Sequence, residues 1–380
     1  MRKPDLILSL PKDHFFARRS SESSKIRMSL SFSISVPVGA WHPFLPACLQ
    51  SLACQKVGLN VSLLDASGDA RVADVASRFA GFLHYRRHGP DGGQSAAIVE
   101  GWAKAPGAIL GWLGADDILM PGALKAALAA FESDPALDMV CGHSAILDQK
   151  GRMTGYHWEV EPPGPRILEA NIISQPSCFF RRAAYEAAGG IDESLHYTMD
   201  WDLWIRLHKS GAKAGFIDAP LSMAMWGDET KTISWGARRR EELRRIIGAY
   251  APAEKRKKIY RAFAIHNLIS RARLAGLTRA VDRGRKSALG IGADGEVRPG
   301  AKLYLAHYGD EPRESVAIEF AGGAESVGIA ASEPAHVTVE SRKTVSVAFK
   351  TPVESGHCVV LTLEPRSVAR VRLRFAQWRG

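Results

Sequence analysis

Apolar and polar positions in the first third of the chain alternate between two spacings. Short apolar or alternating runs predict strands at 31–38, 61–64, 82–85 and 108–113. A stretch with apolar residues at helical spacing follows each run, which predicts helices at 44–56, 72–79, 95–103 and 122–133. Such alternation is typical of a parallel sheet with helices on both faces and right-handed crossovers. The predicted fold class is therefore α/β, with a mostly parallel, Rossmann-like sheet flanked by helices.

The pattern changes in the remainder of the chain. A strand at 139–143, a hairpin at 149–151, a strand and helix after 173–182 and a helix from Trp201 continue the α/β region. Short alternating strands between turn residues at 300–380 predict a small β-sandwich. We expect a disordered tail at 1–28, an α/β domain at 29–236, a basic helical segment at 237–296 and a β-sandwich-like domain at 297–380. That last domain is open to three roles: carbohydrate binding, oligomer contact or structural appendage.

Composition bears on where the protein works. No apolar run reaches the roughly 18 to 20 residues that a transmembrane helix needs, and the N-terminus lacks the apolar region and cleavage site of a signal peptide. The five cysteines form no CxxC pair, so neither a disulfide framework nor a zinc site is indicated. We therefore expect a cytoplasmic protein.

The net charge of +10 is confined to one segment. Residues 238–286 have 16 Lys and Arg against four acidic residues, whereas the remaining chain has 34 basic and 36 acidic residues. This distribution speaks against nucleic acid as a partner of the whole protein. The basic segment is either a solvated helical face or an interfacial helix pair held on anionic lipid at the inner face of the membrane.

Acidic residues follow two of the predicted strands. Asp116 and Asp117 come after the uncharged run at 108–113, and Asp65 follows the run at 61–64. The carboxyl ends of strands in an open α/β sheet are where ligands bind. A carboxylate pair there suits Mg²⁺ or Mn²⁺, which would hold a diphosphate. The alternative is that Asp117 only caps the helix that follows. No GxGxxG or GxxxxGK[ST] sequence is present, which disfavours a dinucleotide fold and a P-loop ATPase.

A further acidic pair stands at a predicted helix start. Asp200 lies at or just before the N-terminus of the helix from Trp201, and Asp202 lies in its first turn. Both fit helix capping and the helix dipole. A carboxylate at this position also stays ionised and can act as a general base.

These motifs together resemble the glycosyltransferases of family 2, which have a GT-A fold. The resemblance covers 31–234 and rests on SISVPV, LLDASGD, PDGGQSAAIVEG, ILGWLGADDILMPGAL, QPSCFFRR, GGIDESLHYTMDWDLWIRL and a closing ETKT. It implies an inverting enzyme that moves a sugar from a nucleotide-sugar donor, with a UDP-sugar expected, to a saccharide or lipid-linked acceptor. A role in cell-surface polysaccharide biosynthesis is implied as well.

The resemblance also implies roles for individual residues. Asp116 would ligate the metal, and Asp200 would be the base that deprotonates the acceptor hydroxyl. Asp65 would contact the nucleobase, and Asp91 would lie near the nucleotide. Substrate contacts are further expected from Ser67, Gly92, Gln94, Asp117, Trp201 and Asp202, although Trp201 at helical spacing also fits a core position.

Three positions depart from the family pattern. Gly114 replaces the first acid of the DxD motif, Val99 stands where Asn is usual, and MAMWGDETKT lacks the usual His, for which Asp228 or Glu229 would have to substitute. These departures keep an alternative open, a non-catalytic nucleotide- or sugar-binding scaffold on the same fold.

Overall fold

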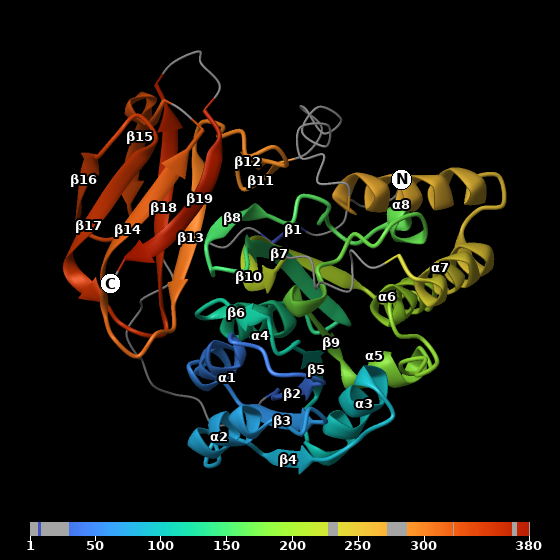
Figure 1. Ribbon diagram of the computed structural model, residues 1–380. Helices are drawn as coiled ribbons and strands as arrows, with labels where there is room; N and C mark the ends of the chain where they lie inside the picture. The colour runs from blue at the N-terminus through green and yellow to red at the C-terminus, as the bar shows by residue number, and fades with distance from the viewer. Residues whose placement is uncertain are drawn as a thin grey trace.

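The computed structural model describes residues 30–226, 235–271, 287–321, 323–366 and 371–379 and the two-residue strand β1 (Ile7–Leu8) (Figure 1). Within the segment expected to be a disordered tail, β1 is the described part, and it pairs in parallel with β10 through Ile7 and Phe216. The expected ETKT motif, with Asp228 and Glu229, lies outside the described residues.

A sheet with the strand order β4-β3-β2-β5-β9-β7-β10 forms the centre of the molecule. Neighbouring strands are parallel except where β9 pairs antiparallel with β5 and β7. The strands are β2 (Phe32–Val38), β3 (Leu59–Asp65), β4 (Tyr85–His88), β5 (Ile109–Trp112), β7 (Met139–Leu147), β9 (Cys178–Arg181) and β10 (Ala214–Met225). The short strand β6 (Ile118–Leu119) pairs with β10. The expected mostly parallel α/β sheet is confirmed.

Helices cover both faces of this sheet (Figure 1). One core contains α1 (Leu45–Ala53), α2 (Ala70–Arg78) and α4 (Ala123–Ser133), and the other contains α3 (Gln94–Lys104), α5 (Arg182–Ala187) and α6 (Met199–Lys209). Alternate residues of one strand serve the two cores, since Ile109 belongs to the first and Leu110 to the second. A strand that is buried on both faces has a continuous apolar sequence, as β5 has.

The edge strand β4 lies three residues later than predicted. The expected strand was 82–85, whereas β4 comprises Tyr85–His88. The apolar Phe82 and Leu83 lie before the strand, where they pack partly buried against the core. The strand itself is polar, with alternating exposure, as is typical of an edge strand. The predicted position was wrong because it was based on the apolar pair Phe82 and Leu83.

The C-terminal part is β-rich, as expected, and forms two sheets (Figure 1). One has the order β13-β18-β15 and the other β16-β17-β14-β19. The strands are β13 (Ala301–His307), β14 (Arg313–Phe320), β15 (Val327–Ala331), β16 (Ala335–Val339), β17 (Thr344–Val353), β18 (His357–Pro365) and β19 (Leu373–Arg379). The second sheet meets the central one where Ala376 of β19 pairs with Met153 of β8 (Met153–Tyr156). A small hairpin of β11 (Ser287–Ala288) and β12 (Ile291–Gly292) precedes them, and η4 (Ala324–Ser326) precedes β15.

The basic segment begins with two helices, α7 (Ala237–Tyr250) and α8 (Arg256–Arg271). Leu243, Ile246 and Ile247 of α7 are buried in the core that also contains α6. Among the described helices, none combines the length and the apolar character that a membrane crossing requires.

Candidate functional site

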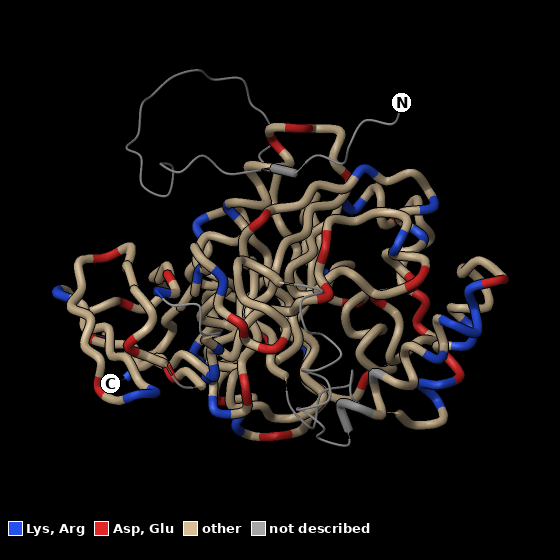
Figure 2. Tube along the Cα trace, turned by 90° about the horizontal axis from the view of Figure 1, so that it is seen from above, with Lys and Arg blue, Asp and Glu red and all other residues tan. Residues whose placement is uncertain are grey.

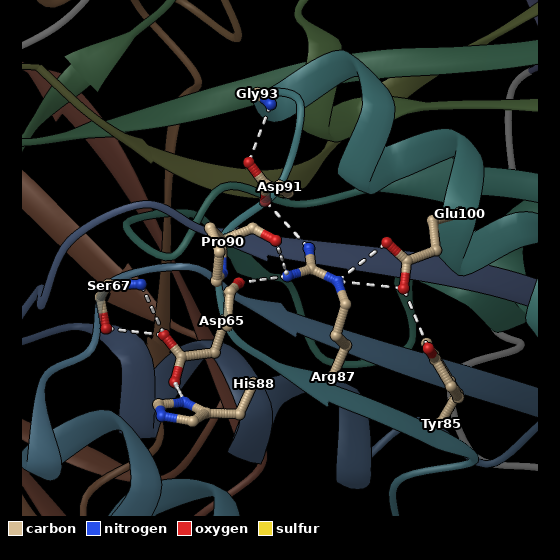
Figure 3. A network of polar contacts seen from close by, with 10 residues as sticks. Asp65, Ser67, Tyr85, Arg87, His88, Pro90, Asp91, Gly93 and Glu100 are labelled. Atoms are coloured by element: carbon tan, nitrogen blue, oxygen red, sulfur yellow. Dashed lines mark hydrogen bonds and ion pairs between the residues drawn. The ribbon is translucent and has the colours of Figure 1, made fainter.

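The ends of β3 and β4 bring together a buried carboxylate and an exposed imidazole (Figure 3). Asp65 and His88 are register partners, and His88 Nδ1 lies 2.7 Å from Asp65 Oδ2. Ser67 donates to Asp65 Oδ1 from its backbone N–H at 2.9 Å and from its hydroxyl at 2.6 Å. Burial raises the pKa of Asp65, but the hydrogen bonds from Ser67 and His88 outweigh it, so the net shift is downward. The carboxylate has no exposed surface, whereas the His88 side chain is 54% exposed.

This geometry bears on the nucleobase contact of Asp65, which stays a prediction. Asp65 was predicted to reach the base itself, yet both of its oxygens are engaged within the protein. In this structure, His88 is the member of the Asp65–His88 pair whose side chain is exposed to solvent. His88 was missed because the sequence placed it in a loop rather than at the end of a strand.

The loop after β4 is held by a second network, centred on Arg87 (Figure 3). Arg87 binds Asp91 at 2.9 Å and Glu100 at 2.8 Å, and it also donates to the Gly89 carbonyl. Asp91 in turn accepts the backbone N–H of Gly93 at 2.8 Å. Gly93 has φ 109°, which a side chain would strain, and it directly precedes α3. Gly92 and Gln94 therefore flank the start of α3, where backbone N–H groups favour an anionic ligand.

Asp116 and Asp117 face the same space beside Gly114. A Cβ atom on Gly114 would lie 2.6 Å from Asp116 Oδ1 and 3.0 Å from Asp117 Oδ2. Asp117 also accepts the Gly114 N–H at 3.1 Å. Burial, and then the charge of Asp116, raise the pKa of Asp117 well above its usual value. Two carboxylates with mutual repulsion form an arrangement that a cation would relieve.

The donor chemistry of this pair fits a hard divalent ion. Carboxylate oxygens are the ligands that Mg²⁺ and Mn²⁺ prefer, and Mg²⁺ commonly takes only one or two carboxylates plus phosphate oxygens and waters. Within the described residues, no cluster of three or more His, Cys, Asp or Glu could complete a site from protein ligands alone. A metal here would therefore depend on Asp116, Asp117 and a bound diphosphate.

The structure predicts that restoring the missing acid of the DxD motif would be harmful. In Gly114→Asp the new Cβ would displace both carboxylates and add a third negative charge. Because the carboxylate oxygens can rotate away from the new Cβ, we expect a loss of stability on the order of 1 kcal/mol, chiefly from repulsion among three carboxylates, and no gain in Mn²⁺ response. Thermal denaturation with and without Mn²⁺ measures both effects. Gly81→Asp is the matched control, because a Cβ there meets nothing within 4 Å. Tighter Mn²⁺ binding by Gly114→Asp would contradict the prediction.

Asp200 is the second residue of α6 and is half-buried. Its Oδ1 accepts the Trp201 N–H at 2.7 Å, and its Oδ2 accepts Nδ2 of Asn171 at 2.9 Å. Burial raises the pKa of Asp200, and these hydrogen bonds together with the charge of Arg239 offset the rise only in part. A carboxylate of raised pKa is a stronger base than an exposed one.

Helix α7 holds the backbone just before Asp200. The buried Glu242 carboxylate accepts the backbone N–H groups of His196, Tyr197 and Thr198 at 3.0, 2.7 and 3.2 Å. Arg238 pairs with Glu242 at 3.3 Å. These N–H groups precede the first turn of α6, so Glu242 fixes the position from which Asp200 projects.

Removing the charge of Glu242 is expected to loosen this support. Glu242→Gln would turn an amide N–H₂ toward N–H donors, so at least one of them would lose its acceptor. The expected destabilisation is about 1 to 3 kcal/mol. Chemical denaturation measures it, and Glu241→Gln on the same helix is the control, because the Glu241 side chain is 77% exposed. Equal stability of the two variants would rule out this role for Glu242.

Two residues expected to contact substrate are instead used in packing. Asp202 is buried and binds Arg206 at 2.7 Å and the Tyr250 hydroxyl at 3.0 Å, which ties α6 to α7. Trp201 is 2% exposed, donates to the Ile167 carbonyl at 2.7 Å and packs against Phe263 of α8. Their burial favours structural roles, and a contact of either side chain with substrate stays a prediction. Sequence spacing could not reveal the partners on other elements, since these lie at least 34 residues away along the chain.

Hydrogen bonds join the elements that carry the acidic residues. The Ser95 hydroxyl of α3 lies 2.9 Å from the Leu195 carbonyl and 2.8 Å from Met199 Sδ, at the start of α6. Gln175 in η2 (Gln175–Ser177) donates to the Trp112 carbonyl at the end of β5, two residues before Gly114. The Trp112 ring at the end of β5 also stacks on the ring of Trp204 in α6, with centroids 5.7 Å apart. The start of α6 therefore adjoins the start of α3, and α6 packs against the end of β5.

A separate cavity of about 340 Å³ lies between α1 and the C-terminal sheets. Its walls contain five aromatic rings, those of Phe44, Phe79, Tyr304, Tyr308 and Trp378. None of the carboxylates described above lines this cavity, so it does not belong to the site at the sheet edge.

The chain is similar in sequence to a known family and to several known proteins. The family described as Glycosyl transferase family 2 matches residues 33–187. A PGL/p-HBAD biosynthesis glycosyltransferase of Mycobacterium bovis is 32% identical over 187 residues, which span 48% of this chain and 71% of that protein. The O-antigen biosynthesis protein RfbC of Myxococcus xanthus is 28% identical over 201 residues, 51% of this chain and 16% of that protein. Chondroitin synthase of Escherichia coli is 23% identical over 208 residues, 52% of this chain and 29% of that protein.

Solved structures show a more distant likeness. Residues 1–349 of S. aureus TarS, in complex with UDP-GlcNAc, superpose with a TM-score of 0.49 at 17% identity, over 63% of this chain and 73% of that one. The mannosyltransferase PcManGT from Pyrobaculum calidifontis, with GDP-Man and Mn²⁺, has a TM-score of 0.44 at 15% identity, over 66% of this chain and 75% of that one.

Proposed function

Since this chain belongs to glycosyltransferase family 2, we propose that it is an inverting transferase that moves a sugar from a nucleoside-diphosphate-sugar to an acceptor hydroxyl. The observation that carries the proposal is Asp200, a half-buried carboxylate of raised pKa in the first turn of α6. This helix packs through Trp204 on Trp112 at the end of β5, just before the acid pair. A general base and a pair of carboxylates that could bind a metal, on one side of a sheet, suit the displacement of a nucleoside diphosphate by a hydroxyl.

Each residue group has a distinct task in this reaction. Asp200 takes the proton of the acceptor hydroxyl, and with a single base and no covalent nucleophile the anomeric carbon inverts. Glu242 holds the segment before Asp200 in place. Asp116 and Asp117 would hold Mg²⁺ or Mn²⁺, which neutralises charge on the leaving diphosphate. Ser67, His88, Asp91, Gly92 and Gln94 would lie along the nucleotide.

The proposed acceptor is a saccharide or a lipid-linked saccharide, and the proposed process is cell-surface polysaccharide biosynthesis. The relatives support this class, since they include an O-antigen biosynthesis protein and a chondroitin synthase. A cytoplasmic enzyme in contact with the inner face of the membrane would meet such acceptors.

A non-catalytic scaffold that binds nucleotide or sugar is the second candidate. It is favoured by Gly114 and by the absence, within the described part of the chain, of a third acidic or His ligand beside Asp116. It would bind a nucleotide without turnover, and without dependence on Asp200.

A thermal-shift experiment tests the proposal directly. UDP, GDP, dTDP and CMP are each added with and without Mn²⁺, and the UDP pair is expected to give the largest metal-dependent rise in Tm. A ligand at a hundred times its Kd stabilises by about 2.7 kcal/mol, which is readily measured. A flat response to all four nucleotides would contradict donor binding. A shift that does not depend on Mn²⁺ would favour the scaffold.

A further inference from the structure

Helix α8 has an outer face that is exposed among the described residues. With about 100° per residue, Lys257, Lys258, Arg261, Ile265 and Leu268 fall within one arc of roughly 100° on the helix. All five side chains are exposed, and Ile265 and Leu268 are 56% and 67% exposed. We call these five residues the outer stripe. It has cations in the first two turns and large apolar side chains in the next two.

The inner face of α8 accounts for its packing. Ile259 is buried, and the ring of Phe263 lies 5.2 Å from that of Trp201. Tyr260 lies beneath the guanidinium of Arg244, at 5.3 Å. The helix is therefore attached to the protein through these residues, and the outer stripe is not needed to hold it there.

Several cations on α7 and in the loop before α8 have acidic partners. Arg238 pairs with Glu242, Arg244 with Glu241, Arg245 with Asp192 and Lys255 with Glu169. In the part of the chain that the structure describes, no ion pair is found for the three cations of the outer stripe. Figure 2 shows basic positions gathered at the right-hand side, where α7 and α8 lie.

We propose that the outer stripe docks α8 on a bilayer surface that contains anionic lipid. The three cations would lie among the headgroups, and Ile265 and Leu268 would enter the boundary with the acyl chains. A nucleic acid would match the cations but would leave the exposed apolar pair in water. A purely apolar protein surface would leave the three cations without partners. The outer stripe has cations and apolar side chains along one line of the helix. A bilayer with anionic headgroups can contact both kinds of side chain at once.

The docking would place the reactive end of the protein near the membrane. Phe263, on the inner face of α8, contacts Trp201, which follows Asp200 in the chain. Only the thickness of α8 and one aromatic pair then separate the bilayer from the start of α6. This consequence rests on the proposed function, because it names the surface from which a lipid-linked acceptor would reach Asp200, whereas docking by itself does not.

Vesicle co-sedimentation with the full chain tests the docking. Vesicles of phosphatidylcholine with one quarter phosphatidylglycerol are expected to sediment the protein at low salt, and vesicles of phosphatidylcholine alone are expected to sediment at least tenfold less. Lys257→Gln/Lys258→Gln/Arg261→Gln and Ile265→Ser/Leu268→Ser are each expected to weaken partitioning at least tenfold, given about fivefold per basic residue and the loss of two buried apolar side chains.

Matched controls lie in the C-terminal β-rich part of the chain. Val337→Ser/Val339→Ser removes another exposed apolar pair, 43% and 49% exposed, and Arg342→Gln/Lys343→Gln/Lys350→Gln removes three other exposed cations. Both controls are expected to partition like the parent. The inference is overturned if the parent does not sediment with anionic vesicles. Loss in the charge variant without loss in the Ile265/Leu268 variant also overturns it, since adsorption to any polyanion would then suffice. The UDP and Mn²⁺ thermal shift, measured on the same variants, reports separately on the proposed function.

Discussion

Asp200→Asn is expected to lower turnover of the nucleotide sugar by about 10²- to 10⁴-fold, the usual contribution of a positioned general base. The fold should tolerate the change. Asn171 Oδ1 is buried without a hydrogen-bond partner among the described residues, so a rotated Asn171 amide can accept the new side-chain N–H₂ at position 200 while the other oxygen still caps Trp201. Replacing an acid of raised pKa with a neutral side chain also removes a half-buried charge.

Steady-state kinetics of the Asp200 variant measure the loss, and the nucleotide thermal shift checks that donor binding remains. Because the base works ionised, turnover of the parent should fall as the pH drops through the pKa of Asp200. Burial raises that pKa, so the fall should begin at a higher pH than an ordinary aspartate would give. Turnover equal to that of the parent would show that Asp200 is not the base, and would favour the scaffold.

Asp116→Ala is expected to abolish the Mn²⁺-dependent part of the nucleotide thermal shift and to lower kcat on the order of 10²- to 10³-fold. The reason is that charge stabilisation by a metal contributes several kcal/mol to such a displacement. Asp117 would then remain without its partner, so its pKa should fall toward the usual value as the charge of Asp116 is removed. The measurements are the thermal shift and kcat, each with and without Mn²⁺.

Asp74→Ala is the matched control for this variant, because Asp74 is an exposed carboxylate on α2. It is expected to leave both the metal response and kcat unchanged. An Asp116→Ala protein that keeps its Mn²⁺ response would place the metal elsewhere and refute the assignment of Asp116.

Several features followed from local sequence alone. The uncharged run of β5 predicted a strand buried on both faces, and the acids after it stand where the sequence placed them. Helical spacing predicted a helix from Trp201 with Asp200 at or just before its start, and α6 begins two residues earlier, at Met199. Alternation predicted the short strands of the C-terminal sheets. These predictions worked because a residue's neighbours in the chain decide its periodicity, and periodicity decides which face is buried.

Only the tertiary structure decided how the site residues are used. The register of β3 against β4 sets Asp65 beside His88, which turns the carboxylate inward and leaves the imidazole exposed. Glu242 reaches the segment before Asp200 from 44 to 46 residues along the chain, and Tyr250 reaches Asp202 from 48 residues away. Such partners depend on how helices and strands pack in space, which cannot be inferred from residue spacing along the chain. The sequence therefore determined which residues could do chemistry, and the packing of distant elements decided which of them are free to do it.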